Sequence, residues 1–153
     1  PSKKEKFEKN GEMYKNKIAK LDEEFSLFIN NLNIDKRYLV SCEGAFSYLT
    51  NDYGLNEAYL WPVNAESQIT PKRMAKVIKL VKEKKIPAVF CESTVSSESQ
   101  RSVATETGAI FGGNLYVDSL SNKNGPAETY LDMLRYNLDT IKKGFNKSLK
   151  NKK

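Results

Sequence analysis

The chain of 153 residues contains no histidine. This absence excludes Ser-His-Asp and Cys-His catalysis, and it excludes any metal site that takes an imidazole from this chain. The two cysteines, Cys42 and Cys91, are too few for a disulfide scaffold. No apolar run approaches the ~20 residues that cross a bilayer, so we expect no membrane span.

The net charge of +6 does not point to a nucleic-acid partner. Much of the basic excess lies near the two ends of the chain, where lysines are usually solvated. No stripe of interleaved aromatic and basic side chains is present to stack bases. The chain opens with a charged helical pattern and not with Met, so we expect it to be part of a longer protein.

The first thirty residues carry the pattern of a long amphipathic helix. Apolar side chains recur at intervals of three, four and seven between Lys3 and Asn31. Such a helix is about 40 Å long, at 1.5 Å per residue. This exceeds what one small domain needs, so the helix either braces another part of the protein or simply packs on its own domain.

Four units that each pair a strand with a helix follow this first helix. The predicted strands cover residues 38–42, 56–61, 86–91 and 114–117. The helix signals are residues 45–53 with Gly54 after them, Thr70 and Pro71 at a helix start, Ser97 with Gln100 as a capping box, Gly108 as a helix end, and an apolar face from Tyr130 to Phe145. The alternation predicts an α/β fold, a single lobe with a four-stranded parallel sheet flanked by helices.

In parallel sheets, sites form at the carboxyl ends of the strands. This rule puts Glu43, the turn Trp61–Asn64, Glu92 with Ser93, and Asp118 on one edge. Glu43 and Asp118 there could act as an acid/base pair, as oxygen ligands of a metal, or as solvated carboxylates at a helix start and a turn. Spacing alone leaves these three uses open and favours the last.

Cys42 also lies at this edge, in the sequence S-C-E-G-A. The motif differs from the G-x-S-x-G nucleophile elbow, and no histidine base exists, so we expect a small buried core residue. A Cys42–Cys91 disulfide is an alternative to free thiols if the first and third strands are neighbours. Free thiols are favoured, because a bridge between adjacent strands is geometrically demanding.

Three segments together resemble one protein family. They are VSCEGAFSYLTNDYGLNEAYLWPVNAESQITPKRM, IPAVFCESTVSSESQRSVATETGA and YVDSLSNKNGPAETYLDMLRYN. They are similar to the C-terminal lobe of the manganese/zinc solute-binding proteins of bacterial metal ABC transporters, a family of metal-receptor lipoproteins. The resemblance implies that residues 1–33 form the long helix between two lobes, that residues 34–153 form the C-terminal α/β lobe, and that the N-terminal lobe is absent.

The resemblance also implies a metal site. Glu43 and Asp118 correspond to the two ligands from this lobe, and two further histidines are expected from the missing lobe. Gly44, Trp61, Asn64 and Ser93 correspond to residues of the site wall or behind the ligands. A glutamate at position 43 is similar to the manganese branch, so Mn²⁺ is favoured, with Zn²⁺ and Fe²⁺ open.

The implied function is capture of Mn²⁺ or Zn²⁺ and delivery to an ABC permease, without enzymatic activity. The full-length protein is expected to be periplasmic or lipid-anchored outside the cell. The isolated lobe is expected to bind metal weakly, because two carboxylates leave most of the coordination shell to water. The alternatives are a flavodoxin-like enzyme that uses Cys42 or the carboxylates at the sheet edge, and a surface adhesin.

Overall fold

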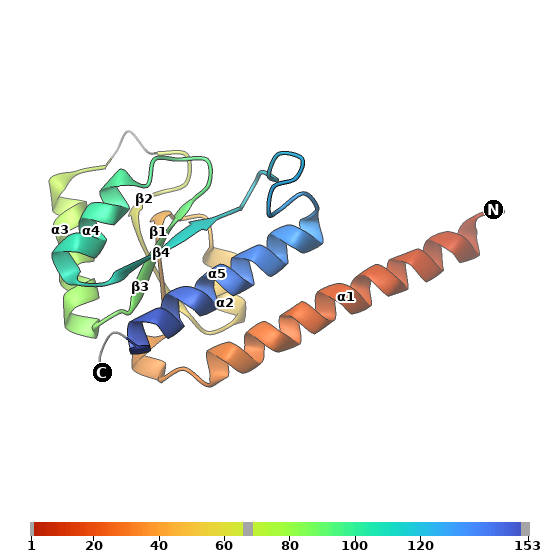
Figure 1. Cartoon of the computed structure of the whole chain (residues 1–153), viewed down its shortest axis with the longest axis horizontal. Helices are drawn as coiled ribbons and strands as arrows, with labels where there is room; N and C mark the ends of the chain where they lie inside the picture. The colour runs from red at the N-terminus through yellow and green to blue at the C-terminus, as the bar shows by residue number, and fades with distance from the viewer. Residues whose placement is uncertain (1, 66–68, 151–153) are drawn as a thin grey trace.

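The computed structural model describes residues 2–65 and 69–150, with side chains up to residue 146 (Figure 1). Residues 66–68, in the loop before the predicted helix start at Thr70, and residues 151–153 of the predicted lobe lie outside the described residues. The elements in chain order are α1 (Lys4–Asn30), η1 (Ile34–Lys36), β1 (Tyr38–Glu43), α2 (Ser47–Asp52), β2 (Asn56–Trp61), α3 (Pro71–Lys84), β3 (Ala88–Glu92), α4 (Glu98–Thr107), β4 (Ile110–Leu115) and α5 (Tyr130–Lys150).

The strands form two parallel pairs. β1 pairs with β2, and β3 pairs with β4. β1 and β3 lie side by side, with 4.7 Å between the Cα atoms of Cys42 and Cys91, which is the ordinary spacing of neighbouring strands. The α/β class with parallel strands is confirmed. The single four-stranded sheet is not, because the described strands β1 and β3 are not joined by a ladder of backbone hydrogen bonds.

Helices cover both faces of the strand layer, so the fold has three layers (Figure 1). Successive residues of β3 alternate between two hydrophobic clusters, because side chains along a strand point to opposite faces. Phe90 belongs to the cluster under α1, α2 and α5, whereas Val89 and Cys91 belong to the cluster under α3 and α4. Every residue of β3 is buried, as expected for a strand covered on both faces.

Helix α1 is anchored at its C-terminal end and extends beyond the body of the lobe (Figure 1). Its buried residues are Phe25 and Ile29, whereas Phe7, near its start, is 69% exposed. Glu24 forms ion pairs of 2.5 Å with two basic side chains of α5, Arg135 and Lys142. The predicted apolar stripe is therefore buried in this structure only where α1 meets α5 and α2.

Strand β4 begins earlier than predicted. The structure has Ile110–Leu115 where the sequence predicted 114–117, so β4 includes Gly112 and Gly113, which precede the predicted strand. The pairing of β3 with β4 contains a bulge in which Gly112 is the extra residue. A Cβ atom at Gly112 would lie 2.2 Å from the Phe90 ring. The glycine therefore lets the strand pass over this core aromatic.

Most predicted helix ends are confirmed, and Ser97 precedes α4 as predicted, but its predicted capping box with Gln100 is wrong. The Thr70 hydroxyl caps α3, and Gly108 ends α4 with a φ of 71°. Ser97 makes no capping bond to the α4 backbone. Gln100, its predicted partner, is buried and donates from Nε2 to the backbone oxygen of Val40 at 3.2 Å. The Gln100 amide binds β1 and therefore does not form the capping box.

Candidate metal site

A cavity of about 210 Å³ lies where β1 and β3 end and where the segment after β4 begins. Three carboxyl groups line it, and none of its described lining residues is basic. The lining residues are Glu43, Ala45, Val63, Asn64, Glu92, Thr94, Val117 and Asp118. The structure thus brings Glu43 and Asp118, the two predicted ligands, to one acidic cavity, as expected for the carboxyl edge of parallel strands.

Glu43 is the last residue of β1 and is half-buried. Its Oε1 accepts a hydrogen bond from the backbone N–H of Asn64. Asn64 has a φ of 57°, a left-handed conformation that asparagine adopts more readily than most residues. The turn after β2 therefore holds the Glu43 side chain in place, and Asn64 contributes to the site through its backbone.

The turn after Glu43 is shaped by close packing. A Cβ atom at Gly44 would lie 2.9 Å from the ring of Tyr59 in β2, so a larger residue would displace either the turn or the ring. Glu57, also in β2, accepts hydrogen bonds from the Phe46 backbone N–H at 3.1 Å and from the Ser47 hydroxyl at 2.7 Å. Strand β2 thus fixes both the turn and the start of α2.

Asp118 is exposed and lies three residues beyond the end of β4. The side chain of Asn137, in α5, binds both backbone groups of Tyr116: it accepts from the N–H at 2.9 Å and donates to the carbonyl at 2.6 Å. The hydroxyl oxygens of Ser93 and Ser119 are 3.4 Å apart. These contacts tie the segment that carries Asp118 to α5 and to the end of β3.

Asn137 was missed by the sequence analysis. A signal was present, because it is a polar residue between Leu134 and Leu138 on the helix face that packs on the lobe. Its amide can both donate and accept, which is what an unpaired backbone segment beside a helix requires.

Glu92 is the last residue of β3 and is only 1% exposed. Its Oε2 accepts a hydrogen bond of 3.0 Å from the backbone N–H of Glu43, and its Oε1 is buried without a partner among the described residues. Burial, together with the nearby Glu43 charge, raises the pKa of the Glu92 carboxyl to about 7, and backbone hydrogen bonds oppose this shift. The sequence placed Glu92 at this edge but gave it no role.

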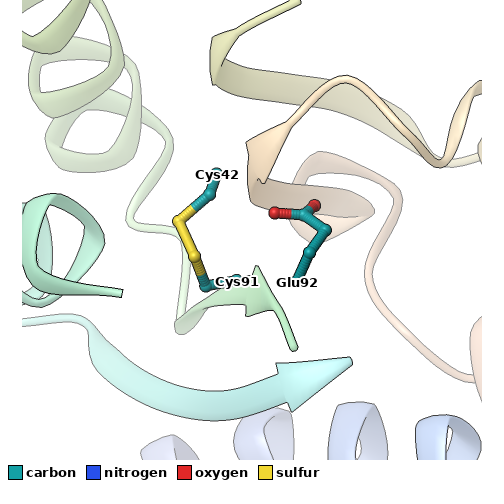
Figure 2. A group of neighbouring side chains, drawn as sticks. All are labelled: Cys42, Cys91 and Glu92. Atoms are coloured by element: carbon teal, nitrogen blue, oxygen red, sulfur yellow. A yellow bond between two sulfur atoms is a disulfide. The ribbon is translucent and has the colours of Figure 1, made fainter. Parts of the chain in front are cut away.

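Cys42 and Cys91 are joined in a disulfide beside this carboxyl (Figure 2). The prediction of free thiols was wrong, because β1 and β3 are neighbours and bring the two Cα atoms within the ordinary range for a disulfide. The two sulfur atoms and the Glu92 carboxylate lie within 4.8 Å of one another. Metal ligation and nucleophilic attack both require a thiolate, so the bonded Cys42 is neither ligand nor nucleophile.

Three of the predicted wall residues lie outside the cavity lining. Trp61 is buried in the hydrophobic cluster under α3 and α4, whereas Gly44 and Ser93 lie in the backbone turns that follow Glu43 and Glu92. Their contribution to a metal site stays a prediction.

The profile of one protein family, described as zinc-uptake complex component A, periplasmic (ZnuA), matches residues 1–144. The chain belongs to this family. The iron-binding protein YfeA of Yersinia pestis is 46% identical over 145 residues, which are 95% of this chain and 47% of that protein. The manganese ABC transporter substrate-binding lipoprotein PsaA of Streptococcus mitis is 33% identical over 96% of this chain and 48% of its own length.

Solved structures of periplasmic metal-binding proteins share the fold of this chain. The manganese-bound periplasmic metal binding protein from Candidatus Liberibacter asiaticus superposes with a TM-score of 0.83 at 41% identity, over 93% of this chain and 52% of that chain. This chain therefore spans about half the length of the curated relatives that it matches. These relatives are substrate-binding transport proteins, as the sequence resemblance implied. Among residues 2–65 and 69–150, no helix is long and apolar enough to cross a bilayer.

Proposed function

We propose that this chain is the C-terminal lobe of a substrate-binding protein that captures Mn²⁺ or Zn²⁺ for an ABC permease. Glu43 and Asp118 supply two of the metal ligands. The observation that carries this proposal is the cavity that both residues line, since none of its described lining residues has a positive charge to balance them. Grouped carboxylates without a counter-charge repel one another, and a divalent cation between them removes that repulsion.

The donor atoms favour a hard or borderline cation. Carboxylate oxygens suit Mn²⁺, and two added imidazoles suit Mn²⁺, Fe²⁺ or Zn²⁺. Affinity order alone favours Zn²⁺ over Mn²⁺ wherever zinc is available. We therefore rank manganese first as the transported ion and keep zinc and iron as competitors.

Two histidines from an N-terminal lobe complete the coordination shell in this proposal. The long α1 supports such an arrangement, because its first half extends beyond the lobe and leaves Phe7, Met13 and Tyr14 between 42% and 69% exposed. Residues 1–33 then form the helix between the lobes, and residues 34–153 form the C-terminal lobe. The complete protein works in the periplasm or as a lipid-anchored receptor, and this lobe alone binds metal weakly.

Calorimetric titration of the complete protein and of this chain with Mn²⁺ and Zn²⁺ tests the proposal. Glu43→Gln and Asp118→Asn keep the shape of each side chain and remove its charge. Each change in the complete protein is expected to weaken binding by more than the roughly 10- to 100-fold that loss of an outer partner of a metal ligand costs.

Glu106→Gln is the matched control, because Glu106 is an exposed carboxylate in α4 that does not line the cavity. Its affinity should equal that of the wild type. If Glu43→Gln and Asp118→Asn both bind metal as tightly as this control, the ligand assignment is wrong.

A further inference from the structure

We propose that Glu92 is a positioning residue that fixes the metal ligand Glu43 through its backbone. This inference rests on the proposed function of the cavity. The carboxylate of Glu92 extends from β3 toward the neighbouring strand (Figure 2), where its Oε2 accepts the Glu43 backbone N–H at 3.0 Å. The contact joins the ends of the two strands whose last residues are Glu43 and Glu92.

The geometry of β1 explains why a side chain is needed there. Backbone N–H groups point alternately to the two sides of a strand. The N–H of Gly44 points to β2 and is accepted by the Trp61 carbonyl at 3.0 Å. The N–H of Glu43 points to β3, but no ladder joins the described strands β1 and β3. Glu92 supplies the acceptor that a β3 carbonyl would supply in a continuous sheet.

Both ends of Glu43 are thereby held. Glu92 binds its backbone, and the N–H of Asn64 binds its carboxylate. Fixing the backbone of a strand residue fixes the direction of its Cα–Cβ bond, and hence the position from which its carboxylate reaches the cavity. A ligand held at two points loses less conformational freedom when a metal binds, which raises affinity.

A purely structural role explains Glu92 poorly. The residue is 1% exposed, and one of its oxygens is buried without a described partner. A buried carboxyl with an unpaired oxygen destabilises a fold relative to an apolar residue of similar volume. Glu92 also lines the cavity, together with Glu43 and Asp118. Costly features of this kind concentrate where function requires them.

The chain contains a matched control for this contact. Gln100 is 0% exposed, binds the β1 backbone through one hydrogen bond to the Val40 carbonyl, and has an Oε1 without a described partner. It contacts the same strand three residues before Glu43. Glu92→Met and Gln100→Met therefore each remove one bond to β1 while conserving volume, but only the first bond reaches the metal ligand.

The test is calorimetric titration of the complete protein with Mn²⁺, with folding checked by circular dichroism. Glu92→Met is expected to weaken binding about 10-fold or more, the usual effect of removing the partner of a metal ligand. Glu92→Gln keeps an acceptor oxygen and should restore most of the affinity. Gln100→Met should bind within about twofold of the wild type, the scatter expected for an independent site.

A second readout needs no metal. In the NMR spectrum of this chain, the Glu43 amide proton should be shifted downfield and protected from exchange by its bond to the carboxylate. Both signatures should disappear in Glu92→Met and persist in Gln100→Met. Loss of the signatures in both variants would mean that β1 frays whenever a buried contact is removed, and that result would overturn the inference.

Glu43→Gln in the same titration separates the two proposals. If Glu43→Gln weakens binding and Glu92→Met does not, or if Gln100→Met weakens it as much as Glu92→Met, the positioning role is refuted and the metal site stands. If Glu43→Gln binds like the wild type, the metal assignment is refuted, and the positioning role with it.

Discussion

The Cys42–Cys91 disulfide should supply a large part of the stability of this lobe. The bond closes a loop with a sequence separation of 49 residues. Restricting the unfolded chain over such a loop is worth about 4 kcal/mol at 25 °C by the loop-entropy relation, and measured values for native disulfides cluster at about 2–4 kcal/mol. We expect loss of the bond to cost about 3 kcal/mol, a large fraction of the roughly 5–15 kcal/mol that stabilises a typical domain.

Urea denaturation of four proteins measures this contribution: the oxidised wild type, Cys42→Ala, Cys91→Ala and the double variant. Either single change breaks the same bond, so each should lower the free energy of unfolding by about 3 kcal/mol. The double variant should lose little more than either single variant, because the bond can be lost only once.

Additive behaviour would refute the reasoning. Without a bond, each substitution would only shorten a buried side chain, at about 1 kcal/mol apiece, and the double variant would lose the sum of the two. A wild-type unfolding midpoint that a reductant leaves unchanged would contradict the bond independently.

Three further predictions concern the contacts around the site. Asn137→Ala removes two hydrogen bonds to the Tyr116 backbone, so the free energy of unfolding should fall by about 1–3 kcal/mol in a urea titration, and metal affinity should fall with it. Glu24→Gln weakens the pairing of α1 with α5, and because these pairs are partly exposed, the loss should be about 1 kcal/mol or less and should shrink at high salt. Burial raises the pKa of Glu92 from 4.5 to about 7, so the folded protein holds the Glu92 proton more tightly than the unfolded chain does. The stability that this proton contributes is fully present below pH 4.5 and is lost as the pH rises through 7. Glu92→Gln should remove this part of the pH dependence, at most roughly 3 kcal/mol between the two limits, and an unchanged pH profile would show that Glu92 titrates normally.

The sequence predicted what depends on local pattern. Apolar periodicity marked α1 and α5, and the Thr70-Pro71 pair and Gly108 marked helix ends that the structure confirms. The alternation of strands with helices then placed Glu43 and Asp118 at one edge. The two residues line the same cavity, which confirms this predicted position. These signals are short-range, so a single sequence contains them.

The sequence did not reveal contacts between residues far apart in the chain. The disulfide, the bond from Glu92 to Glu43 and the bond from Gln100 to Val40 all depend on β3 or α4 meeting β1. Strand order is set by the packing of the whole lobe, and local pattern does not encode it.

The glycines before the predicted fourth strand show a different limit. Glycine is disfavoured in strands, and the predicted strand begins only after Gly112 and Gly113. The structure uses them inside β4, where Gly112 makes room for the Phe90 ring. Only the position of that ring, on another strand, explains the glycine.

Paramagnetic broadening by Mn²⁺ in the NMR spectrum of this chain tests the central claim most directly, because it locates even a weakly bound ion. As small amounts of Mn²⁺ are added, the amide signals of Glu43, Asn64 and Asp118 should broaden first, and Glu43→Gln combined with Asp118→Asn should abolish this selectivity. Broadening that starts elsewhere on the lobe while these three signals stay sharp would contradict the account.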